Sequence, residues 1–363
     1  MICVIVSVLR TPHSSVAVQM RGKRKSCRQS YSSCLGASSR LGLKPVLTGR
    51  RLNTSRRAPK SHSITEKVTP EQLALLLKTE WKLSYVTPLY QFRHTQLRSY
   101  CRQLSAFIAA EKQQGLAVEV EGMQSGYRVS FSAVQGMAEA DDDAETVTIQ
   151  IHSKSMLAKQ DEPEKLVWSG WLSCINGNPD YLHSLPNDFT CLPLFGSSGQ
   201  EVFTFLVQSW FQKTFDCCFG PLEINHTSLQ WLAALWTNCH TESSIQHLKL
   251  IWTLPVEPQL QITYTVNPQD AWSLWSSVRK DPEEENEGEE ESIDFEEVVR
   301  FIQGLKNHFY KHFRLDLSAG TLKQVSTALG SAKYSGRIKI SNSRYMITTL
   351  TLLTEAALLK MPI

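Results

Sequence analysis

No run of about 18 apolar residues occurs in the 363-residue chain, and this absence excludes a protein that crosses a membrane by an α-helix. The patterns GxGxxG, GxxxxGK(S/T), GxSxG and HExxH are also absent, which removes the common signatures of nucleotide-binding, hydrolase and zinc-peptidase sites. The nine cysteines show no CxxC spacing, and their odd number indicates a reducing compartment. We therefore predict a protein without catalytic residues, metal or cofactor.

Acidic residues are nearly missing from the N-terminal segment. Residues 1–67 hold fourteen Lys and Arg but one acid, Glu66, whereas the net charge of the whole chain is +3. Residues 1–63 contain one aromatic residue, Tyr31, so they cannot bury enough surface to offset chain entropy. The composition predicts a disordered basic tail.

Two interpretations of this tail remain open on composition alone. The apolar start and the Arg- and Ser-rich stretch that follows are typical of a mitochondrial transit peptide. The cluster Lys23, Arg24 and Lys25 is equally typical of a nuclear import signal.

A second charge asymmetry lies near the C-terminus. Eleven acids and no base occur from Asp281 to Glu297, and we expect a solvated acidic loop over residues 281–291. The rest of the chain after residue 67 is nearly neutral. These charges exclude a uniformly basic nucleic-acid module and a strongly acidic chaperone-like chain.

Hydrophobic periodicity predicts helices and strands in mixed order. Capping patterns at 69–72 and 227–230 predict helix starts, and Asn267-Pro268 predicts another. Period-two strands are expected at 116–120, 127–134, 147–151, 166–175, 248–254, 260–266 and 337–340, and helices at 70–78, 94–114, 202–215, 227–236, 268–278, 292–309 and 344–359. Because short turns join consecutive strands, we predict an α+β fold with antiparallel pairing and interspersed helices. We divide it into an N-terminal α+β region, 64–240, and a C-terminal α+β region, 241–363.

The residues alone favour a binding or scaffold protein. His308 and His312 are four apart and could share a helix face, but no third ligand accompanies them, so we predict no metal site. The tryptophan-rich stretches could stack bases, although their spacing is more typical of a core.

Long stretches of the chain resemble the centromere protein L family of the inner kinetochore. The stretches are 83–92 (LSYVTPLYQF), 106–120 (AFIAAEKQQGLAVEV), 168–174 (WSGWLSC), 188–195 (DFTCLPLF), 210–219 (WFQKTFDCCF), 231–239 (WLAALWTNC) and 308–322 (HFYKHFRLDLSAGTL). The resemblance covers about residues 66–360 and does not extend to the basic tail.

This resemblance implies a curved antiparallel sheet and a non-enzymatic role in kinetochore assembly and chromosome segregation. It implies a heterodimer with centromere protein N, contact with other subunits of the centromere-associated network, and assembly on nucleosomes that carry the centromeric histone H3 variant, with linker DNA. It favours the nuclear interpretation of the tail. The alternative is a mitochondrially imported α+β protein of unknown activity.

The partner is expected to bind the C-terminal region. A strand with one apolar face can offer its side chains to a partner. If the strand lies at a sheet edge, its unpaired backbone N–H and C=O groups can also pair with a partner strand. The candidates are Leu260, Ile262, Tyr264, Val266, Ile338 and Ile340. The alternative is that these strands complete an internal sheet.

Any DNA contact must come from a local cluster, since the ordered region is nearly neutral. Lys306, Lys311 and Arg314, with Lys323 nearby, are the candidates, and no acid lies between residues 306 and 314. The alternative is that these bases favour the dipole at a helix C-terminus.

Overall fold

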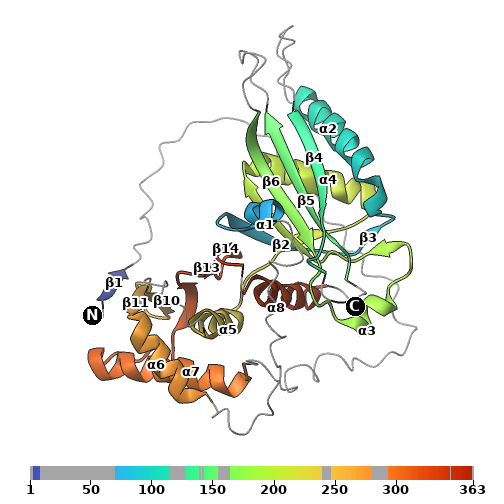
Figure 1. Cartoon of the computed structure of the whole chain (residues 1–363). Helices are drawn as coiled ribbons and strands as arrows, with labels where there is room; N and C mark the ends of the chain where they lie inside the picture. Colours follow the sequence, from blue (N-terminus) through green and yellow to red (C-terminus); the bar gives the residue numbers. More distant parts are fainter. Residues whose placement is uncertain are drawn as a thin grey trace, which may run out of the picture.

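The computed structural model describes residues 3–8, 70–114, 127–138, 140, 143–153, 164–238, 247–279, 293–343 and 345–361. In this part of the chain, twelve strands form one open antiparallel sheet (Figure 1). Eleven of them follow the spatial order β1 (Cys3–Val8), β11 (Leu260–Val266), β10 (Leu248–Leu254), β12 (Thr321–Ser326), β13 (Gly330–Lys333), β14 (Arg337–Ile340), β2 (Glu80–Val86), β8 (Leu194–Gly199), β6 (Lys165–Ser173), β5 (Thr146–Ser153) and β4 (Tyr127–Val134). The twelfth, β9 (Phe219–Pro221), pairs with β2, while β3 (Leu89–Tyr90) and β7 (Phe189–Thr190) form a separate ribbon. The predicted α+β class with an antiparallel sheet is confirmed.

Helices cover opposite faces of the two halves of this sheet. In the N-terminal half, α2 (Leu97–Gln114) and α4 (Glu201–Phe215) lie beside β4, β5 and β6 (Figure 1). Their apolar residues and those of the strands form one core, in which the Phe92 ring stacks on Tyr100 and lies edge-on to Phe215. A short helix, η2 (His94–Gln96), precedes α2, and α3 (Pro179–Ser184) follows β6.

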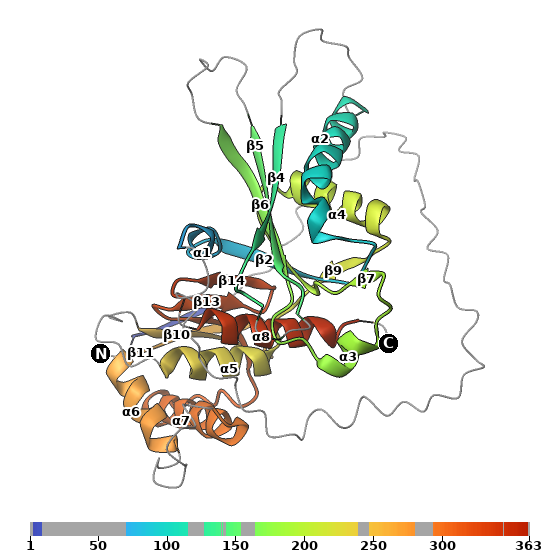
Figure 2. The same ribbon diagram turned by 45° about the vertical axis from the view of Figure 1, so that its right-hand side comes forward.

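The C-terminal half places its helices on the other face. Figure 2 shows α5 (His226–Thr237), α6 (Pro268–Val278) and α7 (Phe295–Phe313) below β10, β11 and β13, while α8 (Met346–Leu358) lies to their right and contacts β2 and β8. They pack on the alternate residues Leu250, Trp252, Ile262 and Tyr264, which are fully buried. Because the side-chain period of a strand is two, the intervening residues of the same strands point away from this core.

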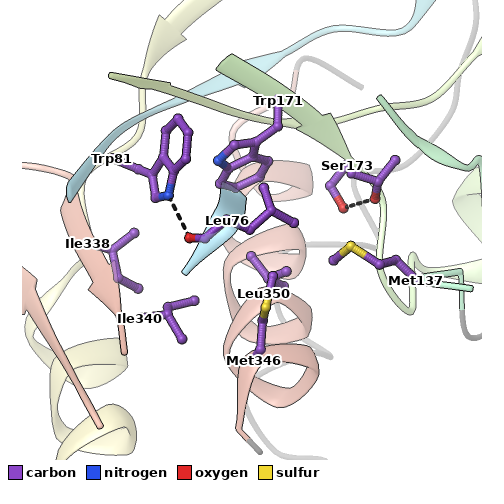
Figure 3. A pocket seen from close by; sticks show the side chains of 10 residues that line it. Leu76, Trp81, Met137, Trp171, Ser173, Ile338, Ile340, Met346 and Leu350 are labelled. Atoms are coloured by element: carbon purple, nitrogen blue, oxygen red, sulfur yellow. Dashed lines mark hydrogen bonds between the residues drawn. The ribbon is translucent and has the colours of Figure 1, made fainter. Parts of the chain in front are cut away.

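The halves meet where β14 pairs with β2. Beneath this pairing, Trp81 and Trp171 pack edge to face at 6.0 Å, and the Trp81 Nε1–H donates to the Leu76 carbonyl of α1 (Pro70–Leu76) at 3.0 Å (Figure 3). Ile338 and Leu350 complete the wall of a void of about 10 Å³, which has room for one water molecule at most. This void is therefore part of the packed core and too small to hold a ligand.

Side-chain caps fix several helix starts. The Asn267 carboxamide accepts from Gln269 N, as the Asn-Pro pair predicted. The start predicted at Thr227 is wrong by two residues, because Asn225 accepts from Ser228 N and is the true cap. Helix α7 is capped by Asp294, whose backbone N–H donates to the Glu297 carboxylate in a capping box.

One short part of the predicted tail is described by the structure, and it is a strand. Cys3–Val8 form β1, which pairs antiparallel with β11 along its whole length. The sequence CVIVSV is rich in β-branched residues, which favour strands. The import cluster at 23–25, the acidic loop 281–291 and the boundary at 240/241 lie outside the described residues.

Candidate nucleic-acid interface

The face of the C-terminal half that its helices leave uncovered carries two rows of side chains, all of them polar except Ile251. Directly paired residues project to the same side of a sheet. The first row runs Thr263, Ile251, Gln324, Lys333, Arg337, Lys82, and the second runs Thr265, Lys249, Ser326, Ser331, Lys339, Glu80. The helices of this half pack against the opposite face, and the side chains of these rows are exposed or half-buried at the surface.

Positive charge dominates these rows. They hold five cations (Lys82, Lys249, Lys333, Arg337 and Lys339) and one acid, Glu80, for a net charge of +4. We call these five cations and Glu80 the basic sheet face. The sequence gives each strand only one or two of these cations, and pairing alone gathers them.

Glu80, at one end of the basic sheet face, contacts two of its cations. Its carboxylate accepts from Lys333 Nζ at 2.7 Å and lies 3.7 Å from Arg337 Nη1. The hydrogen bond from Lys333 is the main reason that the pKa of Glu80 lies below its usual value. The carboxylate therefore stays ionised and holds both cations in position at the surface.

The remaining cations are less constrained. Lys82 Nζ lies 2.7 Å from Glu201 Oε1, at the start of α4, and this bond lowers the pKa of the exposed Glu201. In the described ranges, neither Lys249 nor Lys339 forms an ion pair with a carboxylate. Cations flanked by Ser, Thr and Gln can bind phosphate groups, but they offer no fixed fork with which to recognise one base.

The cations predicted from sequence lie elsewhere. Lys306, Lys311 and Arg314 lie on or directly after α7, which packs on the face opposite the basic sheet face. Lys306 Nζ is 5.4 Å from the centroid of the Trp252 ring, and Lys323, in β12, places its Nζ 3.8 Å from the centroid of Tyr334. Lys323 therefore lies in a strand, whereas the other three lie on or directly after a helix.

The predicted partner-interface side chains are mostly internal. Ile262, Tyr264, Val266, Ile338 and Ile340 are all buried in the core of the C-terminal half, and Leu260 is half-buried against it. The edge of β11 carries β1. These side chains therefore complete an internal sheet in this conformation, and what a partner could use is the backbone edge.

His308 and His312 lie beside this core, and His308 forms a hydrogen bond with one of its residues. Tyr264 and His308 share a hydrogen bond of 2.6 Å between Oη and Nδ1, and the His308 and His312 rings lie 4.5 Å apart. Burial lowers the pKa of His308, and the neighbouring His312 lowers it further. Across the residues that the structure describes, no group of three metal-ligating side chains occurs.

Comparison with known proteins identifies the family. The model of the family "Centromere protein L" matches residues 75–358. The chain belongs to the centromere protein L family. Centromere protein L of Danio rerio is 56% identical over 350 residues, covering 95% of this chain and 94% of that protein. The Gallus gallus protein is 43% identical over 81% of this chain and 83% of its own length, and the Homo sapiens protein 42% over 84% and 86%.

Membership of the centromere protein L family places the chain in the nucleus, at the centromere and its kinetochore. The mitochondrial alternative is therefore wrong. Among the described helices, none combines the length and apolar character that a membrane span requires.

The sequence contained a signal for part of the basic sheet face. In β13 and β14, Lys333, Arg337 and Lys339 alternate with the buried Ala332, Ile338 and Ile340. This alternation predicts a cationic outer face for the hairpin. The cations at Lys82 and Lys249 could not be joined to it, because strand order is not a local property.

Proposed function

We propose that this chain is a non-enzymatic subunit of the inner kinetochore, which pairs with centromere protein N and helps to assemble the centromere-associated network on nucleosomes with the centromeric histone H3 variant. Family membership supports this role. The basic sheet face carries the proposal, because a broad, polar and uncovered surface with a net charge of +4 fits a nucleic-acid backbone.

The basic sheet face is proposed to lie against the phosphates of linker DNA. We expect the replacement of Lys82, Lys249 and Lys339 by Glu to weaken DNA binding of the heterodimer. Because each phosphate contact contributes about 0.9 to the slope of log K against log salt, the slope should fall by about 2 to 3. Binding to a labelled duplex over a salt series measures both quantities.

The cations predicted from sequence provide a matched comparison. Replacement of Lys306, Lys311 and Arg314 by Glu reverses the same number of charges, but on the opposite face of the sheet. If this variant lost DNA affinity and the sheet variant did not, the contact would belong to α7, as the sequence predicted. If DNA affinity changed in neither variant, the DNA contact would belong to another subunit.

Pairing with centromere protein N is proposed to use the edge of β11, where backbone groups can accept a partner strand. Strand β1 occupies this edge, so the partner must displace it. We expect deletion of residues 1–8 to lower the Kd for centromere protein N by about tenfold, which corresponds to about 1.4 kcal/mol. Titration calorimetry with the full-length and shortened chains checks this.

A matched control distinguishes displacement from a general effect of the tail. Replacement of Val4 and Val6 by Pro in the full-length chain removes two backbone donors from β1 and leaves the basic segment in place. It should raise the affinity as the deletion does. Equal affinity of all three chains would mean that the partner binds away from the edge of β11.

A further inference from the structure

The apolar face of α7 is wider than the core that it covers. Val298, Phe301, Ile302, Leu305 and Phe309 are buried against the C-terminal half of the sheet. Alongside them run four exposed apolar side chains, which we call the α7 stripe: Phe295 (49% exposed), Val299 (45%), Tyr310 (49%) and Phe313 (37%).

The spacing of these residues places them on one line. Steps of four, eleven and three residues at 100° per residue keep the α7 stripe within about 60° of the helix circumference, over a length of about 27 Å. Five of the twelve large apolar side chains exposed in the described residues lie between 295 and 315, the fifth being Leu315. Exposed apolar side chains gathered along one side of a helix in this way are typical of a binding site.

The neighbouring helix does not cover this surface. Leu274 of α6 approaches Gly304, where a Cβ would lie 2.8 Å from Leu274 Cδ1. Gly304 lies about half a turn around the helix from the α7 stripe. The close contact with α6 is therefore made on another side of α7, and the stripe is left open.

Charge along α7 is graded. Its first turn holds Glu296 and Glu297, with Arg300 one turn later, whereas Lys306, Lys311 and Arg314 lie in the C-terminal half and at the cap. At 100° per residue, Lys311 lies on the side of Gly304, away from the α7 stripe. Lys306 lies within the line of the α7 stripe. Among the described residues, none of the three cations forms an ion pair. A ligand of this surface must therefore supply apolar groups along the stripe and acid at its C-terminal end.

We infer that the α7 stripe binds an acidic amphipathic helix of another protein, packed antiparallel to α7. An apolar helix face fits a stripe of this length, and acids in the first turn of the bound helix would meet Arg314, whose guanidinium lies 6.0 Å from the centroid of the Tyr310 ring. Acids at a helix N-terminus also favour the dipoles of an antiparallel pair. Duplex DNA satisfies the cations but leaves Phe295, Val299 and Tyr310 in water. This inference goes beyond the proposed function, because it needs neither centromere protein N nor DNA.

The test uses the full-length chain and two labelled helical peptides of about 18 residues. Both carry Leu at positions i, i+4, i+7 and i+11, and one has Glu in its first two turns where the other has Lys. We expect the acidic peptide to bind at micromolar Kd and the basic peptide about tenfold more weakly, as measured by fluorescence anisotropy. Tyr310→Ser with Phe313→Ser should raise the Kd for the acidic peptide by about tenfold or more.

Controls separate this site from general stickiness. Val202→Ser with Phe205→Ser removes apolar side chains from α4 that are 61% and 68% exposed, and it should leave peptide binding unchanged. Arg314→Glu alters an exposed cation beside the α7 stripe and should remove the preference for the acidic peptide, whereas Lys311→Glu, on another side of α7, should leave it unchanged. The inference would be overturned if both peptides bound equally or if the acidic peptide did not bind. It would also be overturned if the α4 variant lost as much peptide binding as Tyr310→Ser with Phe313→Ser.

The same variants test two other occupants of the α7 stripe, a second copy of the chain and single-stranded DNA. Sedimentation measures whether the chain associates with itself. If it does, and if Tyr310→Ser with Phe313→Ser abolishes that association, the α7 stripe binds a second copy of the chain. Single-stranded DNA binding that the same variant abolishes would assign it to stacked bases. Either outcome would overturn a helical protein ligand, whereas a photo-crosslinker at Val299 that captures an acidic amphipathic segment in the kinetochore would support it.

Discussion

Trp81→Ala is expected to destabilise the protein by about 3 to 5 kcal/mol, the range for removing a buried aromatic side chain from a core. Trp81 is 3% exposed and lies where the two halves of the sheet join. Its ring packs edge to face on Trp171 and against Ile338, so a cavity there loosens contacts of both halves at once (Figure 3). Urea unfolding followed by circular dichroism measures the loss.

Two variants bracket this effect. Trp81→Phe keeps an aromatic ring but loses the hydrogen bond to the Leu76 carbonyl, so an intermediate loss is expected. Phe205→Ala removes a side chain that is 68% exposed and should change the free energy of unfolding by less than about 0.5 kcal/mol. A loss below about 1 kcal/mol for Trp81→Ala would contradict the packing described for the junction.

Asp143→Ala is expected to cost about 2 to 4 kcal/mol, because it leaves buried donors without an acceptor. The carboxylate is 8% exposed and accepts from Asn176 N at 2.7 Å, Gly177 N at 2.9 Å and Ala140 N at 3.3 Å. It thereby fixes the turn after β6. Hydrogen exchange should show faster exchange of the Asn176 and Gly177 amides, and urea unfolding gives the energy.

The exchange pattern makes this prediction specific. Asp143→Asn keeps one side-chain oxygen as an acceptor, so about half of the loss is expected. Asp188→Ala breaks an exposed ion pair with Arg93 and should cost less than about 1 kcal/mol. Unchanged exchange at Asn176 and Gly177 in Asp143→Ala would show that the carboxylate does not hold the turn.

Elements whose signals are local could be predicted from the sequence. Strand β11 alternates strictly between apolar and polar residues, and β10 does so except at Ile251; their predicted bounds, 260–266 and 248–254, are those of the structure. Helix α6 begins at Pro268, since Asn267 and the proline favour a helix start by themselves. The central strand β2 was missed, although Trp81 and Leu83 alternate with polar residues in it.

The likeness to the centromere protein L family could also be read from the sequence, because it rests on long runs of residues. The role of individual residues could not. Ile262 and Tyr264 have the same pattern whether their face meets a partner or the protein's own helices, and only the packing of α7 places them inside.

The basic sheet face depends on tertiary structure for the same reason. Lys82 and Arg337 are paired neighbours, although 254 residues separate them along the chain. Hydrophobic periodicity fixes which residues of a strand point outwards, but the order and register of the strands arise from pairing across the whole molecule. The sequence therefore determined the elements, the fold class and the family, while strand pairing between distant segments decided where charge gathers and which apolar faces stay open.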